Sequence, residues 1–223
     1  MRRAPDWSWE LLPAEEKRRY DSSRRRELAQ QNRVSVLDAA RELFLGRGYA
    51  ATTIGEIASR AGVSVETIYK AFGNKPGVAK AVFDVAVVGD AEPVPLFERP
   101  EIKAVQAEPD VPKKIEMWFS HYPARRGRTA PIELIIRDAA ATDRAAAAVR
   151  DQLRDELLRG MRMFATNLVD GGGVRAGLSV EEVADILFAY ISVELYEVLV
   201  LMRGWSLDRY ASFITDALIT ALT

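Results

Sequence analysis

The apolar positions of the chain recur at helical spacing from end to end, and no stretch alternates polar and apolar residues as a half-buried strand does. The first clear example begins near Ser23 and ends at Gly46 to Gly48. Its apolar stripe, at the spacing i, i+3, i+4, i+7, i+8, is Val36, Ala39, Ala40, Leu43 and Phe44. The pattern predicts an all-α protein.

Two short helices joined by a tight turn follow this first helix. Thr53 is a suitable N-cap for a helix over Ile54–Arg60, because its hydroxyl can accept from the first free backbone N–H groups. Gly62 can take the positive φ that the turn requires, and Ser64 can cap a second helix over Val65–Phe72. Two short helices around such a turn predict a helix-turn-helix, with a further helix from Asn74–Lys75 to Val88.

The rest of the chain is expected to form a second helical region. The proline-rich segment 89–100 is predicted to be a loop. The helices expected after it are Pro112–Tyr122, Pro131–Ala140, Asp143–Val169, a continuous helix after Ser179 as far as Met202, and a last one over 206–222.

Composition excludes several kinds of chemistry. The 223 residues include no cysteine and a single histidine, so disulfides, thiol nucleophiles and Cys-type zinc sites are absent. We therefore expect no metal or cofactor. The most apolar stretch, 183–202, contains Asp185, Glu194 and Glu197, which a lipid-facing helix would not readily accept. No membrane association is predicted, and the expected location is cytoplasmic.

The formal net charge of −1 conceals an asymmetry. Residues 1–80 contain 15 Lys and Arg against 10 Asp and Glu, whereas residues 81–223 contain 16 against 22. A local basic excess suits binding to phosphates, although a solvated charged face is the alternative.

At this point the sequence resembles the DNA-binding signature of TetR-family bacterial transcriptional regulators, over roughly residues 33–80. The positions that carry the resemblance are Phe44, Gly48-Tyr49, Thr52-Thr53-Ile54, Ile57-Ala58, Ala61-Gly62-Val63-Ser64, Thr67-Ile68-Tyr69, Phe72 and Lys75. A C-terminal run is also similar to members of this family: Glu194, Tyr196, Leu199-Val200, Gly204-Trp205-Ser206 and Tyr210. The resemblance implies a homodimer with an N-terminal three-helix DNA-binding domain and a C-terminal helical domain for effector binding and dimerisation.

The resemblance also implies roles on the DNA. The second helix of the motif would enter the major groove of a palindromic operator, with Val65, Glu66, Thr67, Tyr69 and Lys70 facing outward. Tyr69 and Lys75 would contact phosphates, helped by Thr53 and Ser64 at helix N-termini. Thr67 and Lys70 are candidates for base edges, and Val65 for a thymine methyl group. The alternatives are core packing for Tyr69 and a merely solvated Thr67.

Two positions depart from the family pattern. Ala71 stands where an aromatic residue or histidine is common, so a frequent phosphate contact is in doubt. Pro76 and Gly77 follow Lys75 where an acidic residue is more usual, which puts the start of the next helix in doubt.

The expected division is an N-terminal extension over 1–22, a DNA-binding domain over 23–80 and a ligand-binding and dimerisation domain over 81–223. Arg18, Arg19 and Arg24–Arg26 are candidates for an arm that reaches the minor groove, with a solvated tail as the alternative. Trp7 and Trp9 are unusual for a disordered tail and favour packing against the protein.

The second domain is predicted to hold an apolar or aromatic effector and to dimerise through the last two helices, whose apolar surface exceeds one stripe. Core packing is the alternative for every pocket candidate. These candidates are Met117, Trp118, His121, Tyr122, Met161, Phe164, Phe188 and Tyr190.

The function predicted from these features is sequence-specific regulation of transcription, by a repressor that a small molecule releases from its operator. One alternative is a DNA-binding architectural protein without an effector. A helical enzyme is the other alternative, and it is disfavoured because Gly171–Gly173 lacks the Lys-Ser/Thr of a phosphate loop and acidic pairs such as Glu181 and Asp185 suit a helix N-terminus.

Overall fold

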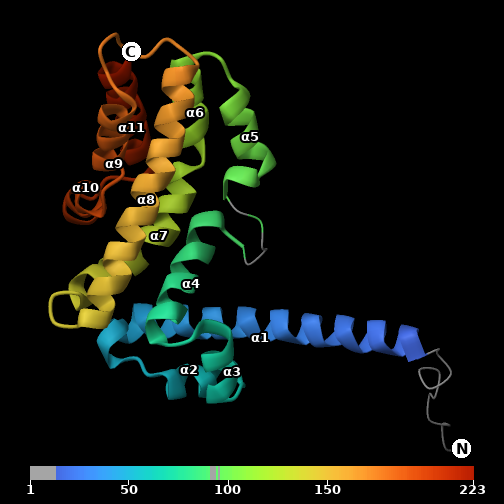
Figure 1. The fold of residues 1–223 in the computed structure, drawn as a ribbon. Coiled ribbons are helices and arrows are strands. Elements are labelled where there is room, and N and C mark those ends of the chain that lie inside the picture. Colours follow the sequence, from blue (N-terminus) through green and yellow to red (C-terminus); the bar gives the residue numbers. More distant parts are fainter. Residues whose placement is uncertain (1–13, 91–93, 95) are drawn as a thin grey trace, which may run out of the picture.

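A computed structural model describes residues 14–90, 94 and 96–223, with side chains from residue 24 onward within those ranges. Trp7 and Trp9 lie outside the described residues, as do the side chains of Arg18 and Arg19. The described residues form helices and no strand, which confirms the all-α class. Figure 1 shows a long α1 beneath an upright bundle, with α4 rising from one part to the other.

The first four helices are α1 (Ala14–Ala51), α2 (Ile54–Ala61), α3 (Val65–Phe72) and α4 (Lys75–Val88). Helix α1 starts nine residues before the expected Ser23, because no glycine or proline interrupts the segment after Pro13. Its N-terminal half projects beyond α2 and α3 (Figure 1). The helix is interrupted at Gly48, whose φ of 81° lies in the left-handed region, as its position at the expected helix end predicts.

The remaining elements are the 3-10 turn η2 (Leu96–Glu98), α5 (Pro100–Ala107), α6 (Val111–Ser120), α7 (Tyr122–Ala139), α8 (Arg144–Asp170), α9 (Val180–Tyr190), α10 (Val193–Tyr196), the π-helical η3 (Glu197–Met202) and α11 (Leu207–Leu222). Helix α5 was not predicted. Helix α7 starts nine residues before the expected Pro131, which lies inside it.

The helix expected to run unbroken to Met202 stops at Tyr190, so this prediction was wrong. Ile191 and Ser192 leave the helix, and the Ser192 side chain accepts a hydrogen bond from the Leu195 N–H at 3.4 Å. A serine with non-helical backbone angles can cap a new helix in this way, and here Ser192 separates α9 from α10.

Two hydrophobic cores hold the molecule together, and both draw on α7 and α8. One contains the buried residues of α1–α4 together with Ile132 and Ile136 of α7 and Val149 and Leu153 of α8. The other lies among α5, α6, α7, α8, α9, α10 and α11. The core of the helix-turn-helix domain therefore includes side chains from α7 and α8, which also contribute to the second core.

Candidate DNA-binding surface and ligand cavity

Helix α2 is held at its N-terminus by a capping box. The Thr53 hydroxyl accepts from the Glu56 N–H at 3.2 Å, and the Glu56 carboxylate accepts from the Thr53 N–H at 2.9 Å. Hydrogen bonds from the Thr53 backbone and hydroxyl, with the charge of Arg47, hold the pKa of Glu56 below its usual value. These bonds satisfy N–H groups at the start of α2 and fix its direction.

The turn to α3 is also fixed by backbone contacts. Gly62 has a φ of 68°, and the N–H of Val63 donates to the carbonyl of Ala58 at 3.1 Å. Ser64 then caps α3 by accepting from the Thr67 N–H at 3.2 Å. Ile68 lies on the inner face of α3 and is fully buried, so the opposite face of this helix points to solvent.

That outward face carries the predicted DNA contacts. Glu66, Tyr69 and Lys70 are exposed, whereas Val65 and Thr67 are half-buried. The Tyr69 side chain is 52% exposed, so it does not pack in the core. The backbone N–H of Glu66 itself and the Ser64 hydroxyl hold the pKa of the Glu66 carboxyl below its usual value. The face therefore presents one phenol, one ammonium and one carboxylate to a partner.

Lys75 lies differently from the other candidates, because its ammonium points toward the body of the domain. The Nζ atom donates to the Tyr49 carbonyl at 3.1 Å and lies 4.2 Å from the centroid of the Tyr49 ring. Burial, reinforced by Asp143, raises the pKa of the Tyr49 phenol to about 12, so the ring stays neutral. An ammonium has three donors, which leaves N–H groups of Lys75 for a phosphate.

The start of α4 explains the unusual Pro76 and Gly77. Asn74 caps α4 by accepting from the Gly77 N–H at 2.9 Å, and Pro76 occupies the first turn, where a missing N–H costs nothing. A Cβ atom on Gly77 would overlap the carbonyl oxygen of Phe72 and lie 3.1 Å from its carbon. Glycine at position 77 therefore allows α4 to follow α3 at close range.

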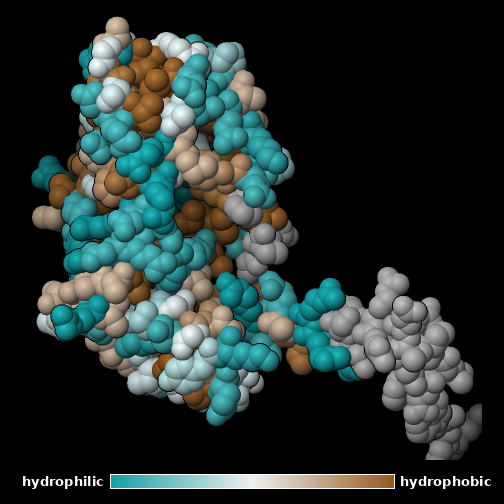
Figure 2. All heavy atoms as spheres, in the orientation of Figure 1, coloured by the Kyte–Doolittle hydropathy of each residue, from teal (hydrophilic) through white to brown (hydrophobic). Residues whose placement is uncertain are grey.

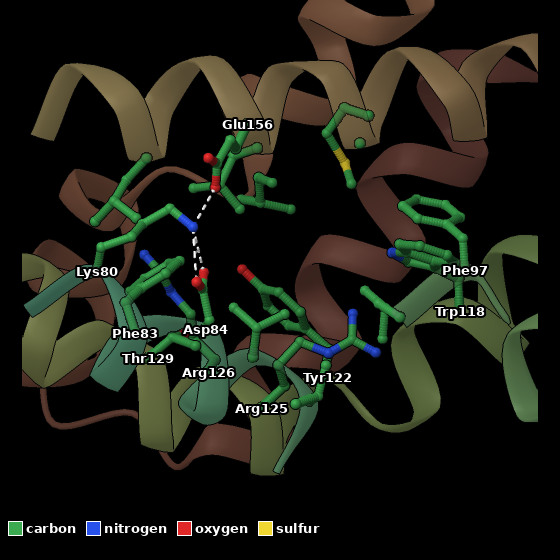
Figure 3. A pocket seen from close by; sticks show the side chains of 18 residues that line it. Lys80, Phe83, Asp84, Phe97, Trp118, Tyr122, Arg125, Arg126, Thr129 and Glu156 are labelled. Carbon is green, nitrogen blue, oxygen red and sulfur yellow. Dashed lines mark hydrogen bonds and ion pairs between the residues drawn. The ribbon is translucent and has the colours of Figure 1, made fainter. Parts of the chain in front are cut away.

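A cavity of about 370 Å³ lies where α4, α6, α7 and α8 meet. Figure 3 shows it between the charged groups on α4 and α8 and the aromatic rings of Phe97 and Trp118. In Figure 2 apolar side chains are visible in a recess beside α8, above the helix-turn-helix. The lining consists of Lys80, Phe83, Asp84, Val87, Val88, Leu96, Phe97, Trp118, Tyr122, Arg125, Arg126, Thr129, Leu153, Glu156, Leu157, Gly160, Met161 and Ile191.

An ion-pair network ties α4 to α8 at one end of the cavity. Lys80 Nζ lies 2.7 Å from the Asp84 carboxylate and 2.8 Å from that of Glu156 (Figure 3). Burial opposes the charge of Lys80, yet its two acidic partners outweigh burial and raise the pKa of Lys80. Burial, reinforced by the charge of Glu156, raises the pKa of Asp84 against the lowering effect of Lys80. This network joins the helix after α3 to the wall of the cavity.

Three of the eight predicted pocket residues line this cavity: Trp118, Tyr122 and Met161. Phe164 is stacked behind Trp118, with ring centroids 4.4 Å apart. Phe188 lines a separate hollow of about 290 Å³ between α8 and α9. Met117 and Tyr190 pack against the core, and His121 is exposed at the end of α6.

Sequence reasoning missed the charged lining. Lys80 and Asp84 are four residues apart on an otherwise apolar helix, and this polar pair was the available signal. Arg125 and Arg126 lie between the two predicted helices Pro112–Tyr122 and Pro131–Ala140, in a segment for which no element was predicted, so they were not considered as lining residues.

Within residues 14–90, 94 and 96–223, no group of three or more His, Asp or Glu side chains is arranged to hold a metal ion. Among the helices in the same ranges, none combines the length and the apolar character needed to cross a bilayer.

Comparison with known proteins identifies relatives of both parts of the chain. Residues 36–82 match the model of the bacterial regulatory proteins of the tetR family. The chain is 27% identical over 178 residues to the HTH-type transcriptional regulator TtgR of Pseudomonas putida, covering 75% of this chain and 80% of TtgR. It is 48% identical over 48 residues to the HTH-type transcriptional regulator AlkX of Mycobacterium tuberculosis, covering 22% and 23% of the two chains.

Solved structures share the fold over most of the chain. FadR of Bacillus subtilis, in complex with stearoyl-CoA, has a TM-score of 0.65 at 19% identity, covering 85% of this chain and 99% of FadR. A putative transcriptional regulator of Saccharomonospora viridis, in complex with choline, has a TM-score of 0.58 at 18% identity, covering 85% and 96%. These similarities confirm the predicted fold, and the named relatives are regulators rather than enzymes.

Proposed function

Since this chain is a DNA-binding transcriptional regulator of the TetR family, we propose that it is a repressor released from a palindromic operator by a small molecule in the α4–α8 cavity. The observation that carries this proposal is the position of α4. This helix starts directly after α3, and five of its residues line the cavity. The repressor would act in the cytoplasm, where the bacterial chromosome lies.

On the DNA, α3 enters the major groove with its exposed face toward the bases. Tyr69 and Lys75 contact phosphates, with Thr53 and Ser64 at the N-termini of their helices. Lys70 and Thr67 contact base edges, and Val65 meets a thymine methyl group. The exposure of Tyr69 and Lys70 supports these roles. The carboxylate of Glu66 faces the same groove and disfavours close phosphates.

Substitutions on α3 and at Lys75, the first residue of α4, distinguish phosphate contacts, which set affinity, from base contacts, which set specificity. We expect Tyr69→Ala to weaken binding to all sequences alike, whereas Lys70→Ala changes the base preferred at one position of each half-site. Lys75→Ala should lower the slope of log affinity against log salt by about 1 per half-site, because one phosphate contact is lost. Selection from randomised DNA measures the base preference, and repeating the binding measurement at two salt concentrations gives the salt dependence of the affinity. Uniform loss across all sequences for Lys70→Ala and Thr67→Ala would contradict the assignment of base contacts.

The surface proposed for dimerisation lies on η3 and α11. Val198, Leu201 and Met202 of η3 are 46%, 56% and 74% exposed, and Phe213 of α11 is 40% exposed. A hydrogen bond of 2.6 Å from Arg137 of α7 to Glu197 anchors η3 to the body. Apolar side chains on an anchored segment favour burial against a second copy, which forms a two-fold helical bundle.

The mechanism proposed for release is a population shift. A ligand in the cavity contacts α4 and α8 together, so it favours the arrangement of α4 that best fits the ligand. Because Gly77 and Lys75 keep α4 close to the end of α3 and to Tyr49, movement of α4 also moves the recognition helix. The small molecules in FadR and in the S. viridis regulator support a ligand in a fold of this kind.

The link between cavity and operator can be tested at Lys80. Lys80→Met removes the cation shared by Asp84 and Glu156, so the two carboxylates repel each other across the α4–α8 contact. We expect the operator affinity of the ligand-free protein to fall by about three- to tenfold, equivalent to roughly 1 kcal/mol. Titration of labelled operator DNA measures this affinity. Lys103→Met, at an exposed lysine outside the network, is the control. An unchanged affinity would show that this network does not couple the two parts.

The function as a whole is tested by selecting genomic fragments that the purified protein binds at low and near-physiological salt. One palindromic site that persists at the higher salt is the expected result. Broad, salt-sensitive recovery without a shared palindrome would instead support an architectural DNA-binding protein.

A further inference from the structure

Arg125 is the charged group of the cavity without an ion-pair partner among the described residues. It is half-buried, and among the described residues no ion pair or hydrogen bond involves its guanidinium. Its guanidinium carbon lies 5.5 Å from the centroid of the Trp118 ring. Burial lowers the pKa of Arg125 and Arg128 adds to this effect, whereas Tyr122 and Glu101 oppose it. An arginine remains charged at neutral pH.

The other charged side chains that line the cavity each form an ion pair within the protein. Arg126 donates to Glu133 at 2.7 Å. Lys80 is shared by Asp84 and Glu156, and Glu156 also accepts from Gln152 at 3.1 Å. A cationic ligand at the carboxylates would have to displace Lys80, whereas an anion at Arg125 displaces no protein partner.

The surroundings of Arg125 determine which kind of anion can bind there. The neighbouring cation on the same helix, Arg128, donates to the Ala86 carbonyl at 3.0 Å. A single planar guanidinium matches a singly charged carboxylate through two parallel hydrogen bonds, whereas a phosphate dianion calls for further cations. The walls around the remaining space are mainly apolar and aromatic, and include Phe83, Val87, Phe97, Leu157 and Met161.

We propose that the effector of this protein is a small amphipathic carboxylate, with its head group on Arg125 and its apolar body between α4 and α8. This inference rests on the proposed function, because it assigns a ligand class to the same cavity. At about 370 Å³ the cavity lies near the lower end of the range for small-molecule sites. The ligand is accordingly a molecule of modest size.

The test uses three ten-carbon compounds with the same chain and different heads: decanoate, decanamide and decylammonium. Binding to the full-length protein is measured by calorimetry without DNA. We expect decanoate to bind at least about tenfold more tightly than decanamide, as for a hydrogen bond between charged groups, and decylammonium to bind more weakly still.

Variants assign the preference to Arg125. In Arg125→Gln the affinities for decanoate and decanamide should become equal to within about twofold, while Arg125→Lys keeps part of the preference. Arg144→Gln, an exposed arginine at the start of α8, is the control and should behave as the wild type. Because Arg125→Gln removes no ion pair and only the contact with the Trp118 ring, we expect cooperative thermal unfolding within a few degrees of the wild type, which shows that the variant folds.

Three results would overturn the proposal: no binding of decanoate, equal or tighter binding of decanamide or decylammonium, or an unchanged preference in Arg125→Gln. Operator binding is measured separately. Decanoate that binds through Arg125 without releasing DNA would leave the ligand class standing and refute the proposed release mechanism. Release of DNA by decylammonium, which has no carboxylate, would refute the ligand class and leave the proposed release mechanism standing.

Discussion

Replacing Gly77 with alanine is expected to destabilise the protein by roughly 2–3 kcal/mol and to weaken operator binding at least about tenfold. The added methyl group would overlap the Phe72 carbonyl oxygen, a backbone atom that cannot rotate away. Helix α4 must then move away from α3, which displaces the recognition helix. In a chain of this length the loss corresponds to a fall in melting temperature of about 4–12 °C, which thermal unfolding measures.

Gly55→Ala is the matched control for this substitution. Gly55 lies inside α2, where the nearest atom to an added Cβ is the Thr53 hydroxyl oxygen at 4.0 Å. Alanine should therefore stabilise α2 by about 0.5–1 kcal/mol, since glycine loses more backbone freedom in a helix. Equal melting temperatures for Gly77→Ala and the wild type would mean that the turn between α3 and α4 relaxes freely, and the proposed rigid connection would fail.

The second large effect is expected for Leu201→Glu on the proposed dimer surface. A buried, unpaired carboxylate at each side of a two-fold contact is strongly unfavourable, so the variant should sediment as a monomer at micromolar concentration. A monomer engages one half-site only and loses the intramolecular binding of the second. We expect its affinity for the full palindrome to fall at least about a hundredfold.

Met163→Glu provides the control, because Met163 of α8 is 54% exposed and Leu201 is 56% exposed. Met163 lies outside η3 and α11, and its substitution should leave both sedimentation and DNA affinity unchanged. If Leu201→Glu stays dimeric, or if its monomer binds the palindrome as tightly as the wild type, then η3 does not form the interface.

The helix-turn-helix was predicted almost residue by residue from the sequence. The bounds of α3 and α4 agree with the expected helices, and α2 ends one residue later than expected. The reason is that these boundaries depend on local chemistry. Thr53 and Ser64 each cap a helix by accepting from the N–H three residues further along the chain, and Gly62 supplies a left-handed turn. Such interactions need no knowledge of distant parts of the chain.

The long helices were predicted less well where tertiary packing competes with local signals. Pro131 was expected to start a helix but lies inside α7, which buries Tyr122 and Arg126 before it and Ile132 and Ile136 after it. Burial on both sides of the proline offsets the hydrogen bond that it removes. At Ile191 the opposite happens, because an apolar pattern that fits one continuous helix is divided by Ser192.

The sequence by itself determined the helical class, the DNA-binding motif and the apolar surface at the C-terminal end, because periodicity and capping are properties of neighbouring residues. The tertiary structure alone decided which residues form the cavity. Trp118 faces the cavity, whereas the aromatic ring of Phe164 is stacked behind Trp118 and does not line the cavity. Arg125 lines the cavity from a segment for which the sequence predicted no helix. A cavity is bounded by helices far apart in sequence, and the side of each helix that faces it depends on how all of them pack together.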